Sequence, residues 1–137
     1  MTKLDEFEKT VKRISKSNMN KHWILVNDKL KEVDLMTWAI WLENKDGKSK
    51  GRITAQTTVK GVFISTVFLG IDHSFGGKVP VLWETMMFKS NKKGLKDYQV
   101  RYSSLKDAKA GHEYAVKFAE YILGIRKTEP KESANML

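Results

Sequence analysis

The fold is decided by one apolar stretch, Val62-Phe63-Ile64-Ser65-Thr66-Val67-Phe68-Leu69. Most of its residues are β-branched or aromatic and almost no polar residue interrupts them, which predicts a central strand covered on both faces. Lys60-Gly61 makes a turn just ahead of it. The loose alternation of polar and apolar residues over 52–58 predicts the strand that this turn joins to the central one.

The elements that follow are two strands and a helix. Pro80 opens a strand over residues 81–88, since the first position of a strand tolerates proline, and residues 98–102 form the last strand. Ser104 and Asp107 make a capping box for a helix that ends at Gly124. The inner stripe of this helix is expected to be Leu105, Ala108, His112, Ala115, Ala119 and Ile122.

Upstream of the central strand the pattern predicts a helix, a hairpin and a second helix. Apolar residues recur at helical spacing at Leu4, Phe7, Val11 and Ile14. Residues 22–26 and 32–33 flank Asn27-Asp28-Lys29, a composition that suits a short hairpin. Asp34 is placed as the N-cap of a Trp-rich helix over 35–43, which is apolar all round and therefore predicted to be buried. A strand is the alternative there, because aromatic residues and Ile also favour sheets.

Together these elements predict an α+β domain, in which a mostly antiparallel β-sheet core carries an N-terminal helix, a short Trp-rich helix and a C-terminal helix. We expect one domain over residues 1–127 and a flexible tail over 128–137. The chain has no cysteine, which excludes disulfide scaffolds and thiolate metal sites. No apolar run resembles a signal peptide or a membrane span, so no membrane partner is expected.

The glycine-rich stretch over residues 70–78 is the first candidate for chemistry. Asp72 and His73 follow the central strand, and Phe75 and two glycines come next. Backbone amides of such a loop approach anions closely, so a ligand loop is one interpretation and an ordinary hairpin turn is the other.

Two further ionisable side chains lie on strands or helices where apolar neighbours surround them. Strand alternation puts Glu84 on the same face as several apolar residues, which indicates either a functional carboxylate or a buried pair with Arg52 or Arg101. His112 lies on the inner stripe of the last helix, as a core histidine or a functional one. No local metal signature is present, and we expect no metal and no cofactor.

The net charge of +9 suggests anionic partners. The positive charge is concentrated in two loops, residues 45–52 and 89–97, and each contains four basic residues and one acidic residue. They carry mostly lysines and no recognisable nucleic-acid-binding motif, so nucleic acid is weakly supported as a partner.

Four sequence motifs resemble those of a family of small proteins encoded by bacteriophages and prophages. Three are residues 34–41, 64–75 and 82–88, and the fourth combines Arg101-Tyr102-Ser103 with Ala110-Gly111-His112. The resemblance spans about residues 33–116. The family's polar signature residues fall on Asp34, Asp72, His73, Glu84 and His112. The resemblance implies a shared pocket, and a place of action in the cytoplasm of an infected bacterial host.

Three functions are compatible with these residues. In the first, a phage anti-defence protein sequesters an anionic nucleotide immune signal, cyclic or ADP-ribose-like. His73, Arg52 and Arg101 then contact phosphate, Phe75 or Trp83 stacks on the base, and Glu84 and Asp72 bind ribose hydroxyls.

The second is a hydrolase or phosphodiesterase, in which His73 and His112 act as acid and base and Asp72 or Glu84 orients them. The third is an inhibitor that binds nucleic acid or protein through the lysine loops. A homodimer or higher oligomer would cover the sheet edges and the N-terminal apolar stripe.

Overall fold

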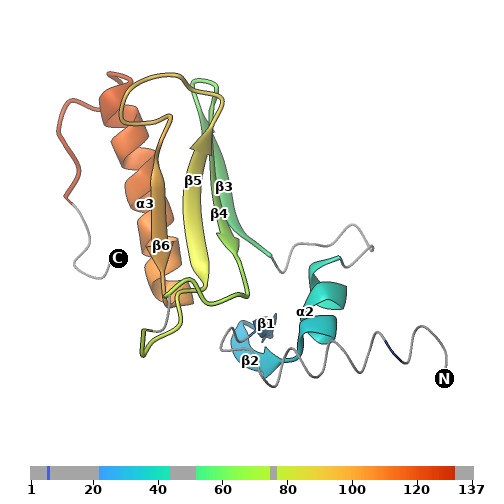
Figure 1. Ribbon diagram of the computed structural model, residues 1–137. Helices are drawn as coiled ribbons and strands as arrows, with labels where there is room; N and C mark the ends of the chain where they lie inside the picture. Colours follow the sequence, from blue (N-terminus) through green and yellow to red (C-terminus); the bar gives the residue numbers. More distant parts are fainter. Residues whose placement is uncertain (1–5, 7–21, 44–51, 75–76, 132–137) are drawn as a thin grey trace.

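The computed structural model describes residue 6 and residues 22–43, 52–74 and 77–131 (Figure 1). The described chain forms two antiparallel sheets and two helices, so the predicted α+β class is confirmed. The predicted N-terminal helix, the lysine-rich loop at 45–51 and Phe75 lie outside the described residues.

A four-stranded antiparallel sheet forms the centre, in the order β3-β4-β5-β6. Its strands are β3 (Ile53–Val59), β4 (Val62–Phe68), β5 (Trp83–Phe88) and β6 (Gln99–Tyr102). Each strand pairs with the next one along the chain, and the connections are the turn at Lys60-Gly61, residues 69–82 and residues 89–98. The β5 strand begins two residues later than predicted, although Leu82 packs in the core and its backbone N–H donates to the carbonyl of Tyr102.

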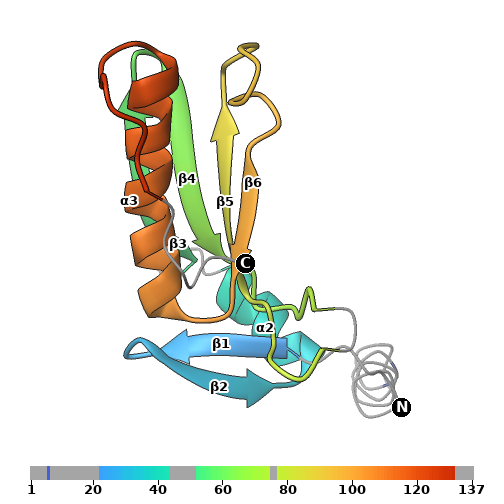
Figure 2. The ribbon, with the colours of Figure 1, turned by 90° about the vertical axis from the view of Figure 1, so that its left-hand side faces the viewer.

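The long helix α3 (Leu105–Ile122) covers one face of this sheet (Figure 2). Its N-cap is Ser104, whose side chain accepts a hydrogen bond from the N–H of Asp107, and the chain turns at Gly124 with a φ of 79°. Ala115 and Ala119 pack on Ile64 of β4, and small side chains at these positions let helix and sheet approach closely. The predicted helix and its caps are therefore confirmed.

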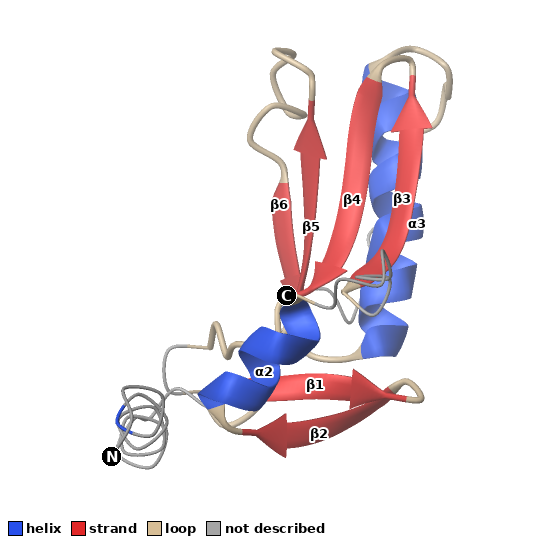
Figure 3. Ribbon diagram, turned by 90° about the vertical axis from the view of Figure 1, so that its right-hand side faces the viewer, coloured by secondary structure: helices blue, strands red, loops and turns tan. Residues whose placement is uncertain are grey.

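No described element covers the opposite face of the sheet (Figure 3). The cross-strand register places Phe63 opposite Phe88 and Glu84 opposite Arg101 on this open face. The expectation that the central strand is covered on both faces is therefore correct on the helix side only. Alternation within β4 explains the difference, since Ile64, Thr66 and Phe68 turn toward α3 and are fully buried.

The N-terminal part of the described chain forms a separate layer at one end of the sheet, shown below it in Figure 2. There β1 (His22–Val26) pairs with β2 (Lys29–Val33) through Asn27 and Asp28, whose positive φ angles of 52° and 63° make the tight turn that hairpins favour. The Asp34 side chain caps α2 (Leu35–Leu42) by accepting from the N–H of Thr37 at 2.8 Å.

Two contacts at Gly70 join this layer to the sheet. The Trp38 indole donates to the carbonyl of Leu69 at 3.2 Å, and the N–H of Trp23 donates to the carbonyl of Gly70 at 2.8 Å. Gly70 has a φ of 73°, and a Cβ there would overlap the Trp38 ring, so only glycine fits this junction.

The prediction that α2 is buried all round is wrong. None of its residues is buried, and Ile40 is 66% exposed. The helix packs through Trp38 and Trp41, which lie three residues apart and so share a face, as the spacing indicated.

Candidate functional site

The loop after β4 is held in shape by Asp72. Its carboxylate accepts from the Ser74 N–H and hydroxyl, both at 2.8 Å, and from the Val81 N–H at 3.0 Å. Burial opposes ionisation of Asp72, but these hydrogen bonds and the nearby His73 outweigh it, and the pKa of Asp72 lies below its ordinary value. Asp72 is therefore a structural clamp that ties the two ends of the loop together.

His73 is oriented by the same loop. Its Nδ1 lies 2.7 Å from the carbonyl oxygen of Ile71, and its backbone N–H donates to the carbonyl of Val81 at 2.9 Å. A carbonyl only accepts, so Nδ1 carries the proton. In the neutral ring Nε2 is then the acceptor, and in the charged ring it is a second donor.

Arg101 and Glu84 form a pair across β5 and β6 on the open face. Arg101 Nε lies 2.9 Å from Glu84 Oε2, and the Gln99 side-chain amide donates to the same oxygen at 2.7 Å. Glu84 is 8% exposed, so its charge is compensated by this pairing. The sequence left open whether Arg52 or Arg101 pairs with Glu84, and the structure shows that Arg101 does.

These groups meet at one recess of about 450 Å³, lined by His73, Ser74, Val81, Gln99 and Arg101. The loop supplies the first three residues and β6 the last two. His73 and Arg101 bring cationic or hydrogen-bonding groups to it, Ser74 and Gln99 are polar, and Val81 is the apolar wall. Such a mixture of few polar groups and an apolar surface is typical of small-molecule sites.

Asp72 and Glu84, which were predicted to bind ribose hydroxyls, do not line the recess and instead hold its loop and Arg101. Three other residues predicted for the site lie away from it. Trp83 is 1% exposed and packs in the core with Phe68, so the prediction that it stacks on a ligand is wrong. Arg52 is exposed at the start of the edge strand β3 and does not line the recess. His112 points into the interface between α3 and the sheet, where it is 6% exposed.

A chain of buried hydroxyl groups satisfies the hydrogen bonds of the buried His112 ring. Its Nε2 and Nδ1 each lie 2.8 Å from a threonine hydroxyl, on Thr57 and Thr66. Thr66 continues the chain to Thr85, whose hydroxyl accepts from the Tyr102 hydroxyl at 3.0 Å. Burial lowers the pKa of His112, and the nearby Glu113 opposes this effect. His73 and His112 thus lie on opposite sides of the sheet, and the acid and base pair of the hydrolase hypothesis is not formed.

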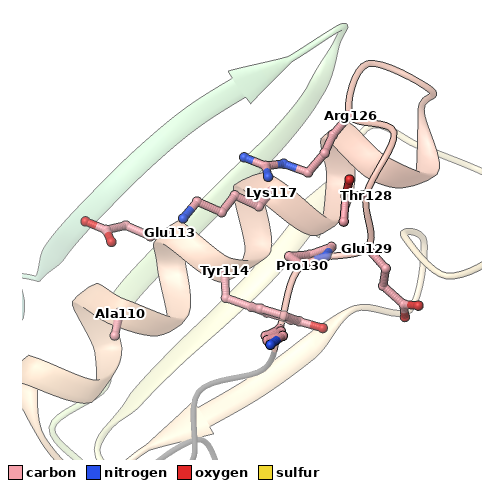
Figure 4. Close-up of a pocket in the computed structure, with 9 residues that line it drawn as sticks. Ala110, Glu113, Tyr114, Lys117, Arg126, Thr128, Glu129 and Pro130 are labelled. Carbon is pink, nitrogen blue, oxygen red and sulfur yellow. The ribbon is translucent and has the colours of Figure 1, made fainter.

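A second hollow of about 390 Å³ lies beside α3, where residues 126–131 run back along the helix (Figure 4). Both charge signs line it, as Lys117, Arg126 and Lys131 together with Glu113 and Glu129. Sequence reasoning missed this hollow because residues 128–131 were assigned to a flexible tail. The balance of charges makes it a weaker anion site than the recess at His73.

The fold and the recess define an α+β domain with one open sheet face and a polar site at its edge. Comparison with protein-family models, curated proteins and solved structures finds no match for this chain. Neither described helix is both long and apolar enough to cross a membrane. Within the described ranges, no three His, Asp or Glu side chains gather closely enough to hold a metal ion.

Proposed function

We propose that this protein binds an anionic, phosphate-bearing nucleotide in the recess between His73 and Arg101 and releases it unchanged. The observation that carries the proposal is the convergence of these two side chains on one hollow of about 450 Å³. In each of them one polar atom is already fixed by an internal hydrogen bond. Groups fixed in advance bind a ligand with less loss of conformational entropy.

The guanidinium group of Arg101 is suited to a phosphate oxygen. Glu84 accepts from its Nε, and the two terminal nitrogens carry the other four N–H donors of the group. The Arg101 side chain is 35% exposed, so these nitrogens are within reach of a ligand. Arginine binds phosphate through two parallel N–H groups, which gives orientation as well as affinity.

His73 adds a second contact. With Nδ1 occupied by the Ile71 carbonyl, Nε2 is the ring nitrogen left to bind a ligand. Ser74 and Gln99 add neutral polar groups for a sugar, and Val81 offers an apolar surface for one side of the base. The aromatic stacking assigned to Trp83 forms no part of the proposal.

The biological role follows from the resemblance of the sequence to phage-encoded proteins. In that setting the protein is an anti-defence factor that sequesters a nucleotide immune signal, cyclic or ADP-ribose-like, in the host cytoplasm. Sequestration is favoured over hydrolysis because His112, the second group of the hydrolytic pair, is bonded to Thr57 and Thr66 on the other side of the sheet.

Calorimetric titration with a panel of cyclic and linear nucleotides tests the proposal. We expect Arg101→Gln to weaken binding by roughly 10- to 100-fold, because one charge-assisted contact contributes about 1.5–3 kcal/mol. His73→Ala should weaken it as well. Arg52→Gln is the matched control, since Arg52 is an exposed arginine outside the recess.

Ligand recovery separates binding from turnover. The complex is heated, and the released nucleotide is identified by mass spectrometry. Intact nucleotide supports sequestration, whereas a cleaved product would assign the protein to the hydrolases. An equal loss of affinity in Arg52→Gln and Arg101→Gln would show that overall charge, and not this recess, attracts the nucleotide.

A further inference from the structure

The open face of the sheet carries an aromatic pair at the end farthest from the recess. Phe63 of β4 and Phe88 of β5 are cross-strand partners, with ring centroids 6.1 Å apart and an interplanar angle of 36°. Phe88 is 44% exposed, although large aromatic side chains are normally buried. Ile64 of β4 packs with α3, so alternation along the strand places Phe63 and its partner Phe88 on the face that α3 does not cover.

Lysines concentrate at this same end of the sheet. Lys89 directly follows β5, and its Nζ lies 5.9 Å from the centre of the Phe63 ring. The turn between β3 and β4 and the loop between β5 and β6 meet at this end because the strands are antiparallel. They contribute five lysines and one acidic residue, namely Lys60, Lys89, Lys92, Lys93, Lys96 and Asp97.

We propose that this end of the open face binds single-stranded nucleic acid. Exposed aromatic rings on a sheet surface stack on unpaired bases of any sequence, and lysines around them bind the phosphates. Duplex DNA offers no free base face to the two rings. A second copy of this chain is disfavoured as the occupant, because each copy would bring a net charge of +9 to the contact.

The surface is distinct from the recess of the proposed nucleotide site. Both lie on the open face, but Arg101 is opposite Glu84, which is four residues from Phe88 on β5, a distance of roughly 13 Å along a strand. Gln99, opposite Met86, is the recess residue on β6 that lies nearer to the aromatic pair. Arg101 serves the first site, and the Phe63 and Phe88 pair serves the second. The inference therefore goes beyond the proposed function and does not depend on it.

Fluorescence anisotropy with a labelled thymidine oligonucleotide of about 12 residues tests the inference. We expect binding that weakens steeply as salt rises from about 50 to about 200 mM. Phe88→Ala should lower the affinity roughly tenfold, since loss of one stacked base costs this much or more. Lys89→Gln should reduce the slope of log affinity against log salt by about 0.7, the value for one lost contact to single-stranded phosphate.

Ile40→Ala is the matched control, because Ile40 is an exposed apolar residue on α2, away from the sheet face. It should leave the affinity unchanged. Equal affinity of Phe88→Ala and Ile40→Ala would overturn the inference, as would equal affinity for the single strand and for its duplex. Poly-glutamate is the second competitor. If it displaces the oligonucleotide, and if Phe88→Ala abolishes this competition as well, the surface binds acidic polypeptides instead.

Discussion

Replacing His112 tests whether the buried hydroxyl chain behind the sheet stabilises the fold. His112→Leu replaces the ring with an apolar side chain of comparable size. It removes both hydrogen bonds of the ring, to Thr57 and Thr66. Thr66 keeps its bond to Thr85, and Thr57 is half-buried and so can bond to water. No hydroxyl is left without a partner, so the loss is that of ordinary hydrogen bonds.

Each such bond contributes about 0.5–1.5 kcal/mol net, so two of them predict a loss of about 2 kcal/mol in the free energy of unfolding. For a domain of this size, that corresponds to a decrease of roughly 1 M in the urea midpoint. The dependence on pH gives a second signature. Burial lowers the pKa of His112 below the ordinary 6.5, so the unfolded chain binds a proton more readily than the folded one.

The stabilisation is therefore complete above about pH 6.5 and decreases as the pH falls below it toward the pKa of the folded state. Urea unfolding at pH about 7.5 and about 5 measures both effects. In His112→Leu the difference between the two pH values should shrink. It should not vanish, because burial also lowers the pKa of His22. A variant with the wild-type midpoint and the wild-type pH difference would refute the assignment of His112 as a buried, neutral, bonded ring.

Three further substitutions test individual features. Gly111→Ala places a Cβ against the buried Tyr102 ring, so we expect a loss of about 2 kcal/mol in thermal or urea unfolding, and unchanged stability would disprove the close approach of α3. Asp34→Ala removes the cap of α2 and should cost about 1 kcal/mol; a matched Ala at exposed Thr37 should cost less. Asp72→Ala removes the three hydrogen bonds that hold the loop of His73, so both nucleotide affinity and the unfolding midpoint should fall, and retained affinity would contradict the clamp role.

The candidate site was predicted in part. Asp72, His73, Glu84 and Arg101 were singled out by residue type and position, and the structure brings His73 and Arg101 to one recess with Glu84 behind Arg101. Trp83 was misassigned because a strand pattern does not say which of its two faces meets the core. Gln99 was missed, since a polar residue at a strand start gives no sign of its partner.

The elements themselves follow from local signals. The cap at Asp34, the turn at Asn27 and Asp28, and the apolar run of β4 all depend on interactions within a few residues along the chain. Backbone sterics and short-range hydrogen bonds favour such features locally, whatever the long-range contacts are. For this reason the order of strands and helices could be predicted from the amino-acid sequence.

Long-range packing decided the rest. Placing α3 on one face of the sheet buried His112 and Trp83 and left Glu84, Arg101 and Phe88 on the other. A strand's alternation defines two faces but not which of them a distant helix will cover, because that choice depends on burying the most apolar surface over the whole domain. The sequence alone thus determined the elements and their order, and only the tertiary structure determined which side chains share a site.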